Sequence, residues 1–531
     1  MSAKSTQRAD SLATLPGDTR VRDARDKVKT LDELGTIAAA ARTAGRTVAL
    51  AHGVFDLVHM GHVRHLEAAH REGDILIVTV TADAHVNKGP GRPIFPELMR
   101  AEMLGALEYV DWVGVNHSPS AETVLNTVKP NVYVKGADYE NPEDDITGRI
   151  VQEQNTVEKH GGRLVFTRDI TFSSSSLINR YLNVYDPPLR DFLERMRRDG
   201  GLKGLLNLIE AVKDYRVVLV GDTIIDEYQY VRPMGKAAKE NIIASQFESR
   251  EVFSGGVIAA ANHVASFCRE VEIVTALGDS DSYEDLVRSQ LLPNVKLTAI
   301  VRPNAPTVRK SRFVDPSYMR KLFEVYFFDD SPFDAETEEL VAAKVAAATD
   351  GADVVIAADY GHGLITGRIV SVLRDNARFL AVNAQTNAGN QGFNLITKYK
   401  HADYICLDAP EARLAVADKY SEIIEMVETK LSKCIDCDRI IITHGQHGCI
   451  IFERGNGPAV RVPAFTNTVI DTVGAGDAFL AVTAPLAKAG GRLEEIGFIG
   501  NAAGAIKVGI VGHRQYVAKV PLVKFLTAIM K

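Results

Sequence analysis

Segments typical of buried strands alternate with segments typical of helices along most of this 531-residue sequence. In the first third, helix-like stretches separate apolar runs at residues 47–51, 74–81, 109–115, 131–135 and 163–167. Continuous apolar strands that alternate with helices predict a parallel sheet covered on both faces. Ligands of such sheets bind at the carboxyl ends of strands, near a switch in strand order. A second region of this kind starts with the strand-like residues 216–221.

The length of the chain bears on its domain organisation, because 531 residues are too many for one hydrophobic core. Residues 1–30 are polar and charged, which predicts a disordered N-terminus. We expect an α/β protein with doubly wound domains at residues 31–183 and 205–531. Residues 184–204 are charged and carry two prolines, which indicates a helical linker.

Charge and composition limit the partners of the chain. There are 61 Lys and Arg against 68 Asp and Glu, a net charge of −7 that argues against nucleic-acid binding. Residues 1–10, MSAKSTQRAD, lack an apolar core, so we expect no secretory signal, and there is no apolar run of the roughly 18 residues that indicate a membrane helix. Five cysteines suit a reducing cytoplasm, where we expect the protein. Cys434 and Cys437 form a lone CxxC, for which a structural role outweighs zinc or redox chemistry.

Residues 52–62, HGVFDLVHMGH, join the first predicted strand to a helix through a glycine-bearing turn. Such a junction presents the free N–H groups of a helix N-terminus, which attract phosphate. His59 and His62 are three residues apart, so both lie on one helix face and can donate to phosphoryl oxygens. The alternatives are an ordinary turn with two capping histidines and a metal pair. Metal is the weaker one, because no carboxylate or cysteine stands at a ligand-like offset.

Three more polar clusters follow strands of this region. The loop NKGPGRPIFP carries Lys88 and Arg92, which suit triphosphate oxygens. Lys135 ends a strand in VKGADY, and Ser174 and Ser175 lie where a serine run opens a helix. Each cluster has a structural alternative, namely a solvated loop, a strand-end lysine and a helix cap. Together, at strand ends of one sheet, they favour a phosphate-binding site.

The histidine turn, with Gly53, Phe55 and Asp56, resembles the HxGH motif of cytidylyltransferase-like nucleotidyltransferases. Residues 30–183 resemble the adenylyltransferase domain of bifunctional heptose-phosphate kinase/adenylyltransferases, through GVFDLVHMGH, KGPGRP, LGALEYVDWV, VKGADY and the serine run. The resemblance implies a Rossmann-like domain in which a sugar 1-phosphate attacks the α-phosphate of ATP or CTP and releases pyrophosphate, with Mg²⁺. It implies catalytic roles for His59, His62 and Lys88. Phosphate or nucleotide contacts are implied for Gly53, Phe55, Arg92, Lys135, Ser174 and Ser175.

The second region carries DTVGAGDAF at residues 471–479. Gly474, Ala475 and Gly476 can point successive N–H groups at one anion, and Asp477 follows directly. A phosphoryl acceptor hydroxyl needs a carboxylate base, and the transferring phosphoryl group needs N–H donors. The motif is not a Walker A loop, because no Lys-Ser/Thr pair follows the glycines. The structural alternative is a glycine-rich helix start with a capping aspartate.

This stretch resembles the second signature of ribokinase-like (PfkB) carbohydrate kinases, and the resemblance covers about residues 205–531. It implies Asp477 as the base and Gly474, Ala475 and Gly476 as the anion hole. ATP contacts are implied for Thr443, Gly445 and Gly448, and contacts to Mg²⁺ for Asp408, which replaces the family's Asn, and Glu411. Sugar contacts are implied for Asp222, Asp226, Gly255, Gly256, Asn262 and Asp359.

Further expectations accompany this resemblance. Asn262 stands six residues after Gly256, farther than the family's asparagine. For Asp222 and Asp226 the structural alternative is a helix cap and a turn acid. We expect a monovalent cation near Asp471 and a small β lid from residues 309–314 and 322–328, through which the chain forms a homodimer.

Both halves resemble the halves of the heptose enzymes in reversed order. Our hypothesis is a bifunctional sugar kinase and sugar-1-phosphate nucleotidyltransferase that makes an NDP-sugar, most similar to ADP-heptose, from a sugar or sugar phosphate and NTPs. One alternative is a CDP-alcohol-type cytidylyltransferase fused to a sugar kinase. The other is that one half is a non-catalytic scaffold or sensor.

Overall fold

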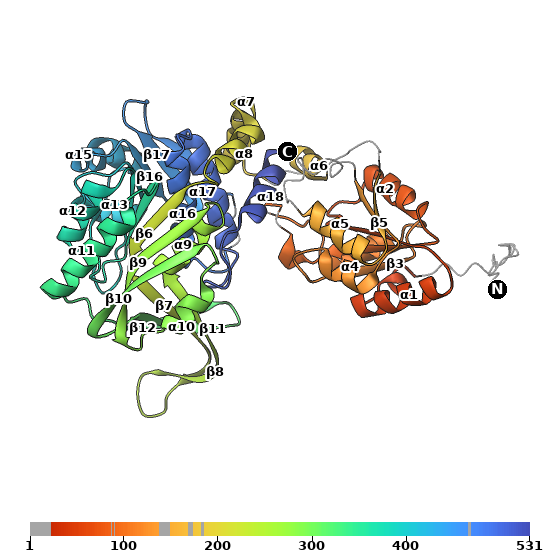
Figure 1. Cartoon of the computed structure of the whole chain (residues 1–531), viewed down its shortest axis with the longest axis horizontal. Helices are drawn as coiled ribbons and strands as arrows, with labels where there is room; N and C mark the ends of the chain where they lie inside the picture. The colour runs from red at the N-terminus through yellow and green to blue at the C-terminus, as the bar shows by residue number, and fades with distance from the viewer. Residues whose placement is uncertain are drawn as a thin grey trace, which may run out of the picture. The chain divides into compact units, whose positions relative to one another are not determined.

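The computed structural model describes residues 23–86, 88–89, 91–136, 149–167, 174–181, 185–465 and 469–531 (Figure 1). The chain divides into two compact units. Unit 1 comprises Met1–Val86 and Pro93–Ser174, and unit 2 comprises Asn87–Arg92 and Ser175–Lys531. The N-terminus predicted to be disordered was residues 1–30, of which residues 1–22 lie outside the described residues, as do parts of VKGADY and of the serine run. Residues 23–30 are ordered, contrary to that prediction, because they form η1 Ala24–Lys27 and Lys29 donates its N–H to the carbonyl oxygen of Val113 at 2.8 Å.

Unit 1 is built on a parallel sheet with the strand order β3-β2-β1-β4-β5. Its strands are β1 Val48–Gly53, β2 Ile75–Thr81, β3 Trp112–Asn116, β4 Val132–Gly136 and β5 Arg163–Thr167. Its helices are α1 Leu31–Thr43, α2 Met60–His70, α3 Glu97–Gly105, α4 Glu122–Val128 and α5 Ile150–Lys159, with short 3₁₀ turns η1 Ala24–Lys27 and η2 Asp83–His85. The strand order reverses beside β1, so the histidine turn leaves the sheet at its switch point.

Both faces of this sheet are buried, because successive residues of a strand point to opposite faces. Ala49 of β1 packs in one core with Leu66 of α2 and Leu104 of α3. Leu50 packs in the other core with Leu34 of α1. The predicted parallel sheet with two covered faces is confirmed.

Unit 2 contains a larger sheet with the order β10-β9-β6-β13-β14-β15-β16-β17-β18, parallel except for β17, which runs antiparallel to both neighbours. Its strands are β6 Arg216–Gly221, β9 Glu270–Ser280, β10 Val295–Pro306, β13 Val354–Asp359, β14 Leu380–Ala384, β15 Tyr404–Asp408, β16 Arg439–Thr443, β17 Cys449–Glu453 and β18 Val460–Val462. Helices α9 Val257–Ala265, α16 Ala475–Lys488, α17 Leu493–Lys507 and α18 Lys519–Met530 contribute to the core on one face. Helices α11 Ala335–Thr349, α12 Gly367–Asn376 and α13 Ala409–Ala415 contribute to the core on the other.

A second sheet of unit 2, which we call the lid, has the order β12-β11-β7-β8. Its strands are β7 Thr223–Lys236, β8 Ile243–Gly256, β11 Val308–Asp315 and β12 Arg320–Phe327, and the β7–β8 hairpin extends from the body of the unit (Figure 1). The sequence predicted β11 and β12 but missed β7 and β8. The outer halves of these two strands are exposed, so no continuous apolar run marks them. Asp226 accordingly lies within β7, not in a turn.

Residues 184–204, predicted as a linker, include α7 Pro187–Arg198 and the start of α8 Gly201–Ala211. Leu189, Leu193 and Met196 of α7 are buried in the core cluster that contains α16 and α17. The rings of Phe192 and Phe498 stack with centroids 5.9 Å apart. In the described structure these helices therefore pack as part of unit 2.

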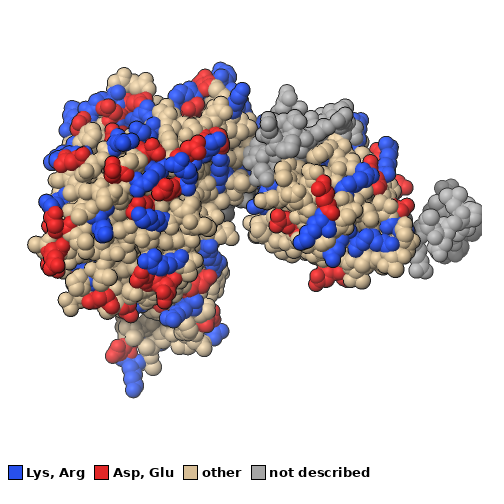
Figure 2. All heavy atoms as spheres, viewed as in Figure 1, with Lys and Arg blue, Asp and Glu red and all other residues tan. Residues whose placement is uncertain are grey.

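The surface of unit 2 carries both signs of charge. Acidic and basic side chains are interspersed over the face shown in Figure 2. None of the helices in the described part of the chain has the length and apolarity that crossing a bilayer requires.

A substitution in the central strands tests this packing. A Cβ atom at Gly221 in β6 would lie 2.2 Å from the carbonyl oxygen of Ala358 in β13. We expect Gly221→Ala to lower the free energy of unfolding by about 1–3 kcal/mol, because the two backbones must separate. Urea unfolding followed by circular dichroism measures the effect. The control is Gly367→Ala at the start of α12, where the new Cβ meets no atom within 4 Å. Equal midpoints for the two variants would contradict the described β6–β13 contact.

Candidate functional site

The histidine turn follows β1 and leads into α2. His59 caps this helix, and its Nδ1 accepts the N–H of Gly61 at 3.1 Å. The rings of His59 and His62 stack with centroids 4.0 Å apart, and Phe55 meets His62 edge-on at 5.2 Å. Gly53 ends β1 immediately before the turn. The two histidines thus lie side by side at a helix N-terminus, as their spacing predicts.

Backbone contacts fix the conformation of this turn. Phe55 has a φ of 49°, an uncommon conformation for a residue with a side chain. The Asp56 carboxylate accepts the N–H of Ile94 at 2.5 Å. Arg100, which sequence analysis missed, is fully buried. It donates to the carbonyl oxygens of Val54, Thr81 and Phe95.

The serine helix, α6 Ser174–Tyr181, makes polar contacts at its first two residues. The Ser174 hydroxyl donates to the carbonyl oxygen of Leu57 in the histidine turn at 3.3 Å. Arg92 donates to the Ser175 hydroxyl at 3.1 Å. Two of the predicted clusters, the KGPGRP loop and the serine run, therefore meet at these side chains.

The structure places the two predicted lysines, Lys135 and Lys88, in different surroundings. Lys135, at the end of β4, is buried and forms an ion pair with Glu153 at 2.8 Å. Glu153 also accepts the hydroxyl of Tyr133 at 3.0 Å. Lys88 is half-buried in its loop. Lys135 therefore already has a carboxylate partner within the protein.

In unit 2, α16 begins directly after Gly474 and carries Asp477 in its first turn. Gly474 has a φ of 76°, and a Cβ atom there would lie 2.6 Å from the ring of His513, so only glycine fits. Asp477 is buried, and its Oδ1 accepts the hydroxyl of Tyr360 at 2.9 Å. Burial raises the pKa of Asp477, while His513 and the Tyr360 hydrogen bond act in the opposite direction.

Two basic side chains near this helix start, Lys507 and His513, were not predicted. Lys507 is fully buried and donates to the carbonyl oxygens of Val473 at 2.8 Å and Gly512 at 2.6 Å. Burial lowers the pKa of Lys507 to about 8. His513 Nε2 lies 3.1 Å from an oxygen of Asp226. Neither residue belongs to a recognisable sequence motif. Their proximity to the start of α16 is therefore visible only in the folded chain.

Among the predicted sugar-binding carboxylates, Asp226 has two basic side chains as partners. It lies between Arg312 of β11 and His513. Burial alone would raise the pKa of Asp226, but these two partners together hold it below its usual range. A Cβ at Gly255 would lie 2.0 Å from the Asp226 carboxylate, which explains the glycine by close packing.

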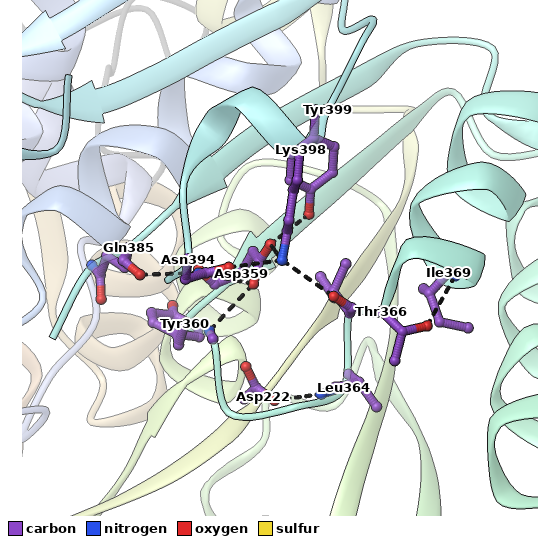
Figure 3. A network of polar contacts seen from close by, with 12 residues as sticks. Asp222, Asp359, Tyr360, Leu364, Thr366, Ile369, Gln385, Asn394, Lys398 and Tyr399 are labelled. Carbon is purple, nitrogen blue, oxygen red and sulfur yellow. Dashed lines mark hydrogen bonds and ion pairs between the residues drawn. The ribbon is translucent and has the colours of Figure 1, made fainter. Parts of the chain in front are cut away.

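Asp222 and Asp359 form hydrogen bonds that hold the loop after β13 (Figure 3). Asp222 accepts the N–H groups of His362 and Leu364, both at 3.2 Å. Asp359 pairs with Lys398 and accepts the hydroxyl of Tyr399 at 2.8 Å. Burial raises the pKa of both carboxyls. Both carboxylates therefore have hydrogen-bonding partners within the protein that hold the loop after β13.

Asn262, on α9, uses its amide to hold the backbone that follows α10 Glu284–Gln290. Its Nδ2 donates to the carbonyl oxygen of Gln290 at 2.8 Å, and its Oδ1 accepts the N–H of Leu292 at 3.1 Å. Asn262 also lines a cavity of about 450 Å³ with Ser254, Gln290 and His513. Gly256 caps the N-terminus of α9.

The predicted nucleotide and Mg²⁺ residues gather at the ends of β15 and β16. Asp408 and Glu411 form a capping box at the start of α13. The Thr443 hydroxyl donates to Asp408 at 3.2 Å, and Glu411 accepts the N–H of Thr386 at 3.2 Å. Burial raises the pKa of Glu411 to about 7. Gly445 and Gly448 flank the turn between β16 and β17.

Asp471 has cationic and polar partners of its own. Lys321 of β12 lies 2.8 Å from its carboxylate, and Tyr228 of β7 donates to it at 2.6 Å. The N–H of Gly512 donates to it at 2.8 Å. Where a monovalent cation was expected, the structure shows the Lys321 ammonium.

The described residues contain no group of three or more His, Cys, Asp or Glu side chains arranged to hold a metal ion. All five cysteines are free thiols, and Cys437 of the CxxC is buried while Cys434 is exposed. Oxygen ligands for Mg²⁺ are therefore limited, in the part of the chain described, to smaller sets such as Asp408 with Glu411.

Comparison with known families accounts for both regions. Residues 214–517 match the pfkB family carbohydrate kinases. The chain belongs to this family. Residues 50–180 match the cytidylyltransferase-like family. A cytidylyltransferase-like domain therefore precedes a pfkB carbohydrate kinase domain, which confirms the family assignment and the α/β fold class expected from the sequence.

Two curated relatives share the name "Bifunctional protein HldE". The one from Trichlorobacter lovleyi is 36% identical over 167 residues, which are 31% of this chain and 33% of that relative. The one from Bradyrhizobium diazoefficiens is 27% identical over 314 residues, 57% of this chain and 62% of that relative. The chain thus matches between a third and just under two thirds of their length.

Similar solved structures cover the kinase domain alone. Arabidopsis thaliana ribokinase, complexed with ribose and ATP, has a TM-score of 0.45 and 16% identity, covering 60% of this chain and 99% of that structure. Escherichia coli phosphofructokinase-2, in complex with potassium, has a TM-score of 0.48 and 14% identity, covering 60% and 100%.

The raised pKa of Glu411 predicts a pH-dependent stability. In the folded chain Glu411 binds its proton up to about pH 7, whereas its ordinary pKa is 4.5. The stabilisation is full below pH 4.5 and is lost as the pH rises through about 7. Glu411→Gln does not titrate, so its stability relative to wild type should rise across this range by at most about 3 kcal/mol.

Thermal unfolding of wild type and variant between pH 4 and about 8.5 measures this difference. Glu425→Gln, which changes an exposed carboxylate of the same domain, is the control. A stability difference between Glu411→Gln and wild type that is constant with pH would contradict the raised pKa of Glu411.

Proposed function

We propose that this chain is a bifunctional transferase, in which the kinase domain phosphorylates a sugar and the cytidylyltransferase-like domain joins the product to a nucleotidyl group. The observation that carries the proposal is the buried carboxylate of Asp477, in the first turn of a helix capped by Gly474. The stacked pair His59 and His62 at another helix N-terminus supports the second activity. Relatives named as bifunctional are similar to both domains.

In the kinase step, a sugar hydroxyl, for which we propose the anomeric one, attacks the γ-phosphorus of ATP. Its proton passes to Asp477, the new O–P bond forms, and the bond between the γ-phosphorus and the bridging oxygen breaks to release ADP. The N–H groups of Gly474, Ala475 and Gly476 would donate to the oxygens of the transferring group. Burial favours this chemistry, because a carboxylate in a dry site is a stronger base than one in water.

In the transferase step, a phosphate oxygen of the sugar 1-phosphate attacks the α-phosphorus of an NTP. The bond from the α-phosphorus to the bridging oxygen breaks, and pyrophosphate leaves. His59 and His62 would donate hydrogen bonds to the phosphoryl oxygens as negative charge grows on them. Lys88, Arg92 and Ser175 would bind the nucleotide phosphates.

Asp408 and Glu411 would hold Mg²⁺ in the kinase domain. Both supply carboxylate oxygens at the end of β15, and each oxygen of Glu411 that accepts a backbone N–H keeps a second lone pair. When bound, the ion supplies positive charge that offsets the charge of the phosphate oxygens. We propose a heptose-like sugar and either ATP or CTP as the substrates, because of the similarity to the relatives named HldE.

We also propose that two chains associate through their lids. Phe323, Val325 and Phe327 alternate along β12, so they share one face of the lid, and their exposed fractions are 53%, 39% and 41%. Exposed apolar patches of this kind mark interaction surfaces.

Val325→Asp should therefore shift the chain from dimer to monomer in sedimentation velocity, because it places a charge within the apolar face. The matched control is Tyr318→Asp in the turn before β12, where 87% of the residue is exposed. A wild-type chain that sediments as a monomer at micromolar concentration would contradict the proposal.

Separate substitutions in the two domains should separate the two activities. Asp477→Asn removes the proposed base, so ADP formation should fall by about 10³-fold or more, at the scale of general-base catalysis. Pyrophosphate release from sugar 1-phosphate and NTP should be unchanged. His59→Ala should do the reverse and lower pyrophosphate release by about 10²-fold. Coupled assays over a panel of sugars, sugar phosphates and glycerol phosphate measure both rates.

Either variant abolishing both activities would contradict independent sites. Pyrophosphate release with glycerol phosphate and none with sugar phosphates would show a CDP-alcohol-type enzyme instead. Full ADP formation by Asp477→Asn would exclude this residue as the base.

A further inference from the structure

A buried hydrogen bond connects Asp477, the proposed base, to the residue that follows β13. The hydroxyl of Tyr360, which follows β13, donates to Asp477 Oδ1 at 2.9 Å. Tyr360 is 2% exposed and Asp477 is 8% exposed. Among the described residues, no other side chain or backbone group donates to this carboxylate. One oxygen of Asp477 is therefore fixed, and the other remains available to a substrate hydroxyl.

The backbone of Tyr360 is held in turn by side-chain amides of the loop after β14. Asn387 and Asn390 each donate from Nδ2 to the Tyr360 carbonyl oxygen at 3.0 Å. Asn390 also donates to the carbonyl oxygen of Gly361 at 3.2 Å. Two amides on one carbonyl leave the peptide little freedom to rotate.

The residues on either side of Tyr360 are held as well (Figure 3). Asn394 donates to the backbone oxygen of Asp359 at 3.0 Å and to its carboxylate at 3.1 Å. Lys398 and Tyr399 bind the same carboxylate. Tyr360 thus projects from a segment fixed before and after it.

The hydrogen bond has a definite direction. Burial and the nearby carboxylates raise the pKa of Tyr360 well above its usual 10, so the hydroxyl keeps its proton and always donates. A donor of this kind favours the ionised carboxylate over the protonated one. In a buried site the bond is stronger than in water.

We propose that Tyr360 is a positioning residue for the kinase reaction: it orients the Asp477 carboxylate and stabilises its ionised form, and the Asn387–Asn390 amides hold Tyr360 in place. The inference rests on the proposed role of Asp477 as the base. Tyr360 itself touches neither the sugar nor ATP in this account.

Other charged groups also act on Asp477. His513 and Lys507 favour its ionised form, whereas Asp226 and Glu411 oppose it. All four remain in a Tyr360→Phe variant, which loses one hydroxyl and keeps the ring. The variant therefore isolates the contribution of a single hydrogen bond.

The test compares Tyr360→Phe with Tyr404→Phe. The Tyr404 hydroxyl is also buried and also bonds to α16, donating to Thr483 at 2.8 Å, away from Asp477. We expect Tyr360→Phe to lower kcat for ADP formation roughly tenfold to a hundredfold, as for a lost hydrogen bond to a charged group. KM for ATP should stay within about twofold, because binding of ATP does not depend on Asp477.

The pH profile is the more specific measurement. Without the donor, the pKa of Asp477 rises further, so the acidic limb of kcat/KM should move to higher pH in Tyr360→Phe and stay in place in Tyr404→Phe. Asn390→Ala, which removes a donor to the Tyr360 carbonyl, should lower kcat in the same direction with an unchanged KM for ATP. Pyrophosphate release by the other domain should not change in any of the three variants.

Wild-type kcat and an unshifted acidic limb in Tyr360→Phe would overturn the inference, as would equal effects of Tyr360→Phe and Tyr404→Phe. Asp477→Asn, measured alongside, separates the positioning role of Tyr360 from the role of Asp477 as the base. If it is inactive while Tyr360→Phe behaves as wild type, only the positioning role fails. If it is fully active, the proposed base and this inference fail together.

Discussion

Charge buried inside the kinase domain must be compensated, because an unpaired buried ion costs several kcal/mol. Asp226 meets this constraint with Arg312 and His513, and Asp471 meets it with Lys321. The Arg312–Asp226 pair joins β11 to β7 within the lid. Lys321 of β12 with Asp471, and Asp226 of β7 with His513, attach the lid to segments beside the start of α16. The position of the lid strands and the geometry of the proposed anion hole at Gly474–Gly476 are therefore coupled.

The same constraint divides the carboxylates into two groups. Asp222 and Asp359 accept hydrogen bonds that hold the loop after β13 and the residues that follow β14. Asp477 has one fixed oxygen and one available oxygen. The difference follows from hydrogen-bonding partners and not from residue type, which is why a search for aspartates at strand ends cannot separate them.

Much of the fold could be predicted because parallel strands are buried on both faces. The run at 74–81 contains β2, of which all but the last residue are buried. The strand predicted at residues 163–167 is β5, an edge strand of which only Thr167 is buried. The hairpin of β7 and β8 escaped prediction because its outer half packs against no core. Residues 184–204 look like a linker by charge, yet α7 buries one apolar face in unit 2.

In the candidate sites, too, sequence patterns predict local arrangements but not contacts between distant segments. His59 with His62, and Gly474 with Asp477, could be predicted because their spacing is local and the helix brings them together. Tyr360 and Asp477 are 117 residues apart in sequence, and Lys507 and His513 approach Gly474 only through the packing of α16 and α17. Contacts of this kind depend on tertiary structure and leave no local pattern.

A ³¹P NMR time course of the intact protein with a heptose or heptose phosphate, ATP, CTP and Mg²⁺ shows whether one chain carries out a phosphoryl transfer followed by a nucleotidyl transfer. We expect a sugar 1-phosphate resonance that rises as ADP forms. That resonance should then decline as pyrophosphate and the diphosphate pair of an NDP-sugar appear. A sugar phosphate that accumulates to completion, with pyrophosphate never formed from it, would contradict the account.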